Sequence, residues 1–233
     1  MSLITDPHKI ELHWQAGRNG LVGADSGAVL LEDRDFEISG TSCSDADAAY
    51  DADQGLALET AGGATDSEQV IMLPQTAADN VSLWREIAWT VDNLPCYEAV
   101  IRTDALHALM EIECGLVLTM PSPFDAATDA NQVKFTYLQG TDTNWQVCVS
   151  VGNADTSHDT GVPVVASTVY HFAIHVGRDR IARCYINEKL VAVTAALTTT
   201  VDLLPTVGVQ AGTATQACKI YVRELAISRE LVA

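Results

Sequence analysis

Apolar and polar residues alternate over much of the chain, and two neighbouring segments in its last third show this most clearly. Residues 170–176 and 180–187 place apolar side chains at every second position, and residues 177–179 (Gly-Arg-Asp) separate the two runs. A period of two is typical of strands with one buried face, and a short polar turn between such runs is typical of a hairpin. We therefore predict an antiparallel hairpin here, with Tyr170 and Phe172 on its buried face.

Strand-like runs recur at short intervals along the rest of the chain, and turn-forming residues separate them. In addition to the hairpin they cover residues 69–73, 83–91, 98–103, 111–119, 132–138, 145–151, 190–195, 206–210 and 218–227. No run predicts a helix, apart from a turn or two over residues 75–83. In the last run Val222 and Leu225 would face opposite ways, so we expect a bulge near Arg223 and Glu224 to bring both inward.

The pattern divides the chain into two parts. Residues 1–40 carry mixed signals and predict an N-terminal arm with one or two short strands. Residues 42–63 are rich in Ala, Asp, Gly, Ser and Thr, which is typical of a loop or an entry strand. We expect residues 41–233 to form one all-β jelly-roll sandwich of about ten or more antiparallel strands.

Composition excludes several classes of partner. Hydrophobic residues make up 48% of the 233 residues, so the chain has enough apolar material for a core. The 31 acidic and 13 basic residues give a net charge of -18, which repels nucleic acids and anionic membranes. The first residues lack the pattern of a signal peptide, and no apolar run approaches the roughly 20 residues of a spanning helix. We expect no direct nucleic-acid or membrane partner and a product made in the cytoplasm.

The chain offers few residues with the spacing of a metal site. Its six cysteines include no Cys-x-x-Cys pair and predict reduced, structural thiols. His171 and His175 share a strand face but lie about 13 Å apart along it, too far for one ion. The aspartates of one loop are candidate calcium ligands, although they lack the spacing of an EF-hand and a solvated capping loop is the alternative. These candidates are Asp45, Asp47, Asp51 and Asp53.

Catalytic signatures are equally scarce, and we expect no catalytic residue and no cofactor other than calcium. Glu111 and Glu113 lie on one strand face about 7 Å apart. Their segment resembles the signature of family 16 glycosidases, but Glu113 replaces an aspartate and Gly115 occupies the place of the second catalytic glutamate. A solvated strand face is the favoured interpretation.

Three tryptophans are candidates for contact with a ligand or partner, because an exposed aromatic ring stacks on sugars and anchors protein interfaces. They are Trp14, Trp84 and Trp145. For Trp84 the favoured alternative is that the N-terminal arm covers the ring.

The segments around the hairpin resemble a known family. The resemblance is to the concanavalin A-like, laminin G-type sandwich of tailed-phage structural proteins, and it lies in residues 160–176, 182–192, 204–209 and 220–228. The chain departs from that pattern at Val169, where the family has tryptophan, and at Glu188, where it has glycine. Because this sandwich serves lectins, hydrolases and scaffolds alike, the motif indicates fold more than function.

The resemblance implies a non-enzymatic virion protein that is assembled in the host cytoplasm. It would decorate or cement the capsid, or belong to the tail or a fibre, and would dock on partners such as the major capsid protein through residues 1–40. The family further implies a homo-oligomer, and we expect a trimer. Two alternatives remain open: a calcium-assisted, lectin-like module that binds host glycans through Trp84 or Trp145, and a glycosidase related to family 16.

Overall fold

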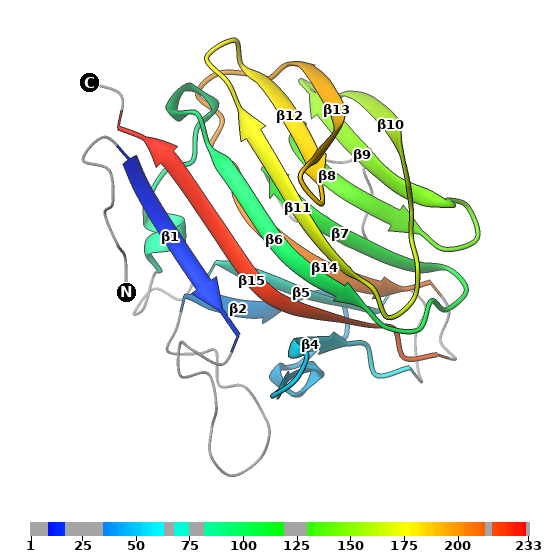
Figure 1. Ribbon diagram of the computed structural model, residues 1–233. Coiled ribbons are helices and arrows are strands. Elements are labelled where there is room, and N and C mark those ends of the chain that lie inside the picture. Colours follow the sequence, from blue (N-terminus) through cyan, green and yellow to red (C-terminus); the bar gives the residue numbers. More distant parts are fainter. Residues whose placement is uncertain are drawn as a thin grey trace.

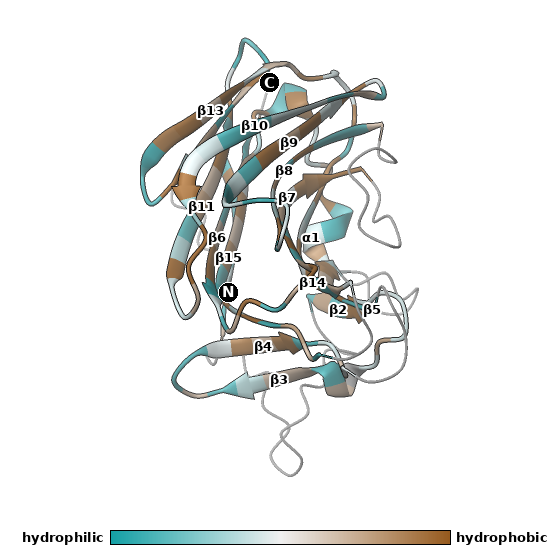
Figure 2. Ribbon diagram, turned by 90° about the vertical axis from the view of Figure 1, so that its right-hand side faces the viewer, coloured by the Kyte–Doolittle hydropathy of each residue, from teal (hydrophilic) through white to brown (hydrophobic). Residues whose placement is uncertain are grey.

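The chain folds into an all-β sandwich of two antiparallel sheets. The computed structural model describes residues 9–16, 35–62, 68–74, 82–118, 130–212 and 216–231. These residues form fifteen strands, and the two sheets face each other across the core (Figure 2). The predicted jelly-roll architecture is confirmed.

The first sheet has eight strands, and β1 (Lys9–Gln15) pairs with β15 (Lys219–Glu230) at one edge of it. This pairing places a strand near the start of the chain beside the last strand (Figure 1). The other members, in spatial order, are β13 (Lys189–Ala196), β12 (Ile181–Ile186), β11 (Val169–Val176), β6 (Cys96–Thr103), then β15, β4 (Gly55–Glu59) and β3 (Ala48–Asp51).

The second sheet has seven strands. Their spatial order is β10 (Ala154–Pro163), β9 (Asn144–Val151), β8 (Asn131–Leu138), β7 (Met110–Val117), β14 (Leu204–Ala211), β5 (Glu68–Pro74) and β2 (Phe36–Ser39). Helical structure in the described residues is limited to single turns, namely η1 (Asp45–Asp47), α1 (Leu83–Glu86) and η2 (Val91–Asn93).

Alternating side chains from both sheets fill one hydrophobic core. Phe135 of the seven-stranded sheet lies 4.8 Å from Phe172 of the eight-stranded sheet, between ring centroids. The Trp145 ring packs edge-on against Phe172 at 4.8 Å and against Tyr170 at 5.4 Å. The Tyr97 hydroxyl crosses the core and donates to the Thr206 carbonyl at 3.0 Å. Aromatic pairs of this geometry add to the burial energy of the rings.

The predicted hairpin and the predicted bulge are both confirmed. Strands β11 and β12 pair antiparallel, and Phe172 lies opposite Ile186. The register of β15 against β6 shifts between Val222 and Glu224, which keeps both Val222 and Leu225 buried.

The prediction of a strand over residues 83–91 is wrong. The Ser82 carbonyl accepts hydrogen bonds from the next turn and starts α1. The Trp89 indole donates to the Trp84 carbonyl at 2.6 Å, and the Trp89 backbone N–H donates to Asp202 at 2.6 Å. These bonds fold the segment back on itself, and local alternation does not reveal them.

The described part of residues 1–40 belongs to the sheets: β1 pairs with β15, and β2 pairs with β5. The segment 42–63, expected to be a loop or an entry strand, contains η1 and the β3–β4 pair. No helix in the described ranges is long and apolar enough to span a membrane.

We predict that Phe172→Ala lowers the free energy of unfolding by about 3–5 kcal/mol, because it leaves a cavity beneath three other rings. Urea unfolding followed by tryptophan fluorescence measures the loss. The control is Val169→Ala on the same strand, where the side chain is 39% exposed and the expected change is within about 0.5 kcal/mol. Equal effects of the two substitutions would contradict the assignment of Phe172 to the core.

Candidate functional site

The outer face of the seven-stranded sheet carries a row of hydrogen-bonded polar side chains. Gln69, Gln210 and Glu111 lie directly opposite one another on β5, β14 and β7. The Gln69 amide donates to Gln210 at 2.9 Å, and the Gln210 amide donates to Glu111 at 3.4 Å. These two bonds connect three strands, and the Thr41 hydroxyl extends the row by donating to the side-chain oxygen Oε1 of Gln69 at 3.3 Å. Because each amide has a fixed partner, the donors and acceptors keep one orientation.

A buried ion pair lies beside this row. The Lys134 ammonium on β8 is 2.5 Å from the Glu113 carboxylate on β7, and the two side chains are 1% and 2% exposed. Gly115 is the register partner of Lys134, and its φ is +153°. A Cβ at Gly115 would lie 2.6 Å from Lys134 Cα, too close for any other residue. The absence of a side chain at Gly115 therefore permits the close packing of Lys134.

Two members of this surface reach solvent. Glu111 is half-buried, and so is Gln146 on β9, whose amide donates to the Asn144 carbonyl at 3.2 Å. Gln69, Glu113, Lys134 and Gln210 are buried. We call this surface the polar face, and it consists of Gln69, Glu111, Glu113, Lys134, Gln146 and Gln210.

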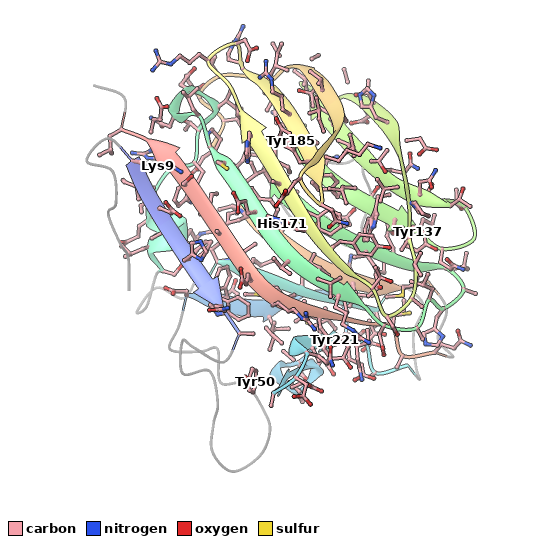
Figure 3. The ribbon with its side chains drawn as sticks, in the orientation of Figure 1. Lys9, Tyr50, Tyr137, His171, Tyr185 and Tyr221 are labelled. Atoms are coloured by element: carbon pink, nitrogen blue, oxygen red, sulfur yellow. The ribbon has the colours of Figure 1, made fainter. Side chains whose placement is uncertain are left out.

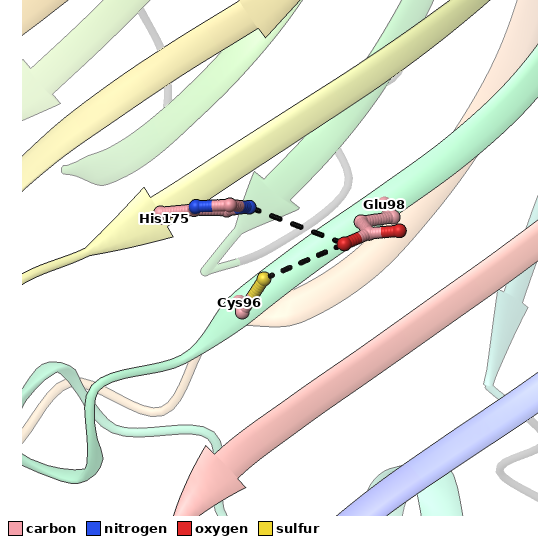
Figure 4. Close-up of side chains that lie close together, drawn as sticks. All are labelled: Cys96, Glu98 and His175. Atoms are coloured by element: carbon pink, nitrogen blue, oxygen red, sulfur yellow. Dashed lines mark hydrogen bonds and ion pairs between the residues drawn. The ribbon is translucent and has the colours of Figure 1, made fainter. Parts of the chain in front are cut away.

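The eight-stranded sheet has a groove of about 810 Å³ on its outer face. Cys96 on β6 lies directly opposite His175 on β11 and opposite Ser228 on β15. Glu98 projects from the same face of β6, and Figure 4 marks the contacts of one carboxylate oxygen with Cys96 and with His175. Lys9 lies at the rim of this groove.

Two histidines flank the Glu98 carboxylate. Its Oε1 is 4.0 Å from His175 Nε2, and its Oε2 is 3.5 Å from His171 Nε2. Burial raises the pKa of the Cys96 thiol to about 12, and the Glu98 charge adds to the shift. Partial burial lowers the pKa of His175, which keeps its imidazole neutral at pH 7. The Tyr185 ring packs against His175 at 5.1 Å between ring centroids. Figure 3 labels Tyr185 and His171, which both belong to the eight-stranded sheet.

The candidate tryptophans lie inside the molecule. Trp14 and Trp84 are each 2% exposed, and both pack against Phe36, with ring centroids 6.1 and 4.7 Å away. The expectation that residues 1–40 cover Trp84 is met by Phe36. Trp145 is fully buried in the aromatic core. These positions leave the three rings no exposed surface for a ligand.

Two of the four candidate calcium ligands, Asp47 and Asp51, accept hydrogen bonds within their own turns. Asp47 accepts from the backbone and hydroxyl of Ser44, at 2.6 and 3.2 Å. Asp51 accepts from the Asp53 and Gln54 backbone at 2.9 Å. The side chain of Asp45 lies outside the described part. A calcium role for this loop stays a prediction.

No protein family and no curated protein matches the chain in sequence. Solved structures match its fold at low identity. A protein of unknown function from Shewanella oneidensis MR-1 aligns with a TM-score of 0.60 at 10% identity, over 100% of this chain and 92% of that one. A GlcNAcα1-4Gal-releasing endo-β-galactosidase from Clostridium perfringens gives 0.63 at 10% identity, over 98% and 64%. An alginate lyase from Pseudomonas aeruginosa gives 0.55 at 14% identity, over 78% and 85%.

These neighbours correct the prediction of function. The main interpretation as a non-enzymatic virion protein that docks through residues 1–40 is wrong, because the similar structures include alginate lyases and an endo-β-galactosidase. They give no support to a phage origin. The lectin-like alternative agrees better with them, and the concanavalin A-like architecture that accompanied the virion prediction holds.

Sequence reasoning identified part of the polar face and missed the rest. The shared face of Glu111 and Glu113 followed from their spacing. Lys134 was missed because it falls on a strand with apolar neighbours, and its pairing with Glu113 depends on the register of β7 and β8. Gln69 and Gln210 are 141 residues apart in sequence and gave no local signal.

We predict that Lys134→Met lowers the free energy of unfolding by about 3–5 kcal/mol, because it leaves the buried Glu113 charge without its cation. The double variant Lys134→Met/Glu113→Leu should recover most of the loss. Chemical denaturation measures the free energy of unfolding of both variants. The control is Lys189→Met at an exposed position of β13, where we expect a change within about 0.5 kcal/mol. A single variant as stable as the parent would show that the pair is not coupled.

Proposed function

We propose that this protein binds a carbohydrate on the polar face. The observation that carries the proposal is the hydrogen-bonded row from Gln69 to Glu111, with the buried pair of Lys134 and Glu113 beside it. A buried ion pair contributes little to stability compared with apolar side chains of the same size, so stability alone does not account for it. Fixed amides and carboxylates present both donors and acceptors, which hydroxyl groups of a sugar require. The carbohydrate-active neighbours support this choice of ligand.

Charge favours a neutral glycan over a polyuronate. The net charge of -18 repels anionic polymers. The polar face itself contains the carboxylates of Glu111 and Glu113 and only the one ammonium of Lys134, which is already paired. We therefore infer that the ligand is a neutral oligosaccharide, and that it contacts the half-buried Glu111 and Gln146.

The test is a binding titration with neutral galactose-containing oligosaccharides and alginate trisaccharide in parallel. We expect the neutral glycans to bind and Glu111→Gln to weaken binding by about 10- to 100-fold, the value of one hydrogen bond to a charged group. The matched control is Glu188→Gln, an exposed carboxylate in the turn between β12 and β13 of the other sheet, which should bind as the parent does. Absence of glycan binding, or equal binding by Glu111→Gln, would contradict the proposal.

A second candidate function is cleavage of the bound glycan. The backbone positions of Glu111 and Glu113 on β7 are about 7 Å apart by strand rise, and side chains that project in parallel from them keep a similar spacing. Carboxyl groups of inverting glycosidases are roughly 6.5–9.5 Å apart. The two carboxylates have different partners, since Lys134 pairs with Glu113 and Gln210 donates to Glu111. Different environments let two acids take different roles in proton transfer.

We predict that a neutral glycan bound by the protein is hydrolysed with inversion, and that Glu111→Gln and Glu113→Gln each slow hydrolysis by more than about 100-fold. Mass spectrometry detects the products, and early proton NMR spectra give the anomer released. Each variant needs an unfolding curve, because Glu113 is buried. If the parent protein binds the glycan but leaves it intact after prolonged incubation, the cleavage proposal is rejected and the binding proposal stands.

A further inference from the structure

We propose that the groove of the eight-stranded sheet holds a zinc ion on Cys96, Glu98 and His175. In the part of the chain that the structure describes, these residues form the one group of three or more metal-ligating side chains whose ligand atoms all lie within 4.8 Å of one another. The site is on the opposite sheet from the polar face and does not depend on the proposed carbohydrate function.

Strand register brings the three ligands together. Cys96 and His175 are direct partners on antiparallel strands, and Glu98 is the next residue of β6 on the same face. Glu98 Oε1 lies 4.0 Å from Cys96 Sγ and 4.0 Å from His175 Nε2. Ligand atoms of a tetrahedral zinc ion lie about 3.4–3.6 Å apart. All three ligand atoms lie within 4.8 Å of one another here, so the side chains must close up by roughly 0.5–1 Å to complete the geometry.

Each ligand also has a neighbour that orients it. His171 holds the second oxygen of Glu98 at 3.5 Å, Tyr185 packs against the His175 ring, and Ser228 hydrogen-bonds to Cys96. Partners of this kind fix the direction of metal ligands, and their loss commonly weakens metal binding.

The donor set selects the metal. Thiolate and imidazole ligands favour zinc and related transition metals, whereas calcium and magnesium prefer oxygen ligands alone. A metal ion deprotonates a coordinated thiol by supplying positive charge. Three protein ligands leave a fourth position, which faces the groove and is available to water or a small anion.

The test is calorimetric titration of the reduced, metal-stripped full chain with zinc, and absorption spectroscopy with cobalt as the probe. We expect one ion per chain, a thiolate-to-cobalt charge-transfer band, and no competition from calcium. Cys96→Ser and His175→Gln should each weaken zinc binding by more than about 100-fold, and His171→Gln by about 10-fold. His175 lies on the surface, so its variant remains informative where Cys96→Ser fails to fold.

Two matched controls separate the groove from general metal binding. His13→Gln removes a histidine that lies 3.7 Å from Glu11 on β1 and does not line the groove. Cys43→Ser removes a half-buried thiol outside the groove. Both should bind zinc as the parent does. The proposal is overturned where the folded parent binds no zinc, where His175→Gln keeps parental affinity, or where either control loses as much as the groove variants.

Discussion

The antiparallel register of β6 with its two neighbours is the constraint on which both surfaces of the eight-stranded sheet depend. Side chains alternate between faces, so a slip of one residue would move Tyr97 and Ile101 out of the core and Cys96 and Glu98 into it. The bulge in β15 after Val222 preserves this arrangement by restoring the inward face of the last strand. The groove is thus positioned by the same pairing that buries the aromatic core.

The polar face differs from the rest of the fold because it buries two charged side chains, Lys134 and Glu113, and their desolvation costs free energy. Desolvation of Lys134 and Glu113 is offset by their contact only because the geometry is close, and Gly115 supplies the space for it. Gly208, the partner of Glu113 on β14, likewise adds no side chain to this surface. An outward strand face carries apolar or solvated residues at lower cost, and this is the physical reason for the proposal that the fixed donors and acceptors serve a ligand.

The sequence predicted the strands of the fold better than the residues of the candidate sites. The reason is that strands follow from local alternation, whereas the sites depend on contacts between residues distant in sequence. Alternation is local, so strands such as β6, β8 and β11 followed from it, and so did the bulge. Strand β10 is an exposed edge strand without apolar alternation, and it was missed. The burial of Trp14 and Trp145 was not predicted for a related reason: the rings that pack against them, Phe36 and Phe172, are distant in sequence.

The same distinction explains why a resemblance gave the correct architecture and the wrong function. The matching segments contribute Tyr170, Ile174 and Ile186, which are buried core positions at 3%, 0% and 1% exposure. Such residues form the core of the sandwich, and proteins with the same fold but unrelated activities have similar core residues. Of the polar face, neither Gln69 nor Glu111 lies in those segments. Evidence for function therefore had to come from outward-facing side chains whose neighbours only the strand register reveals.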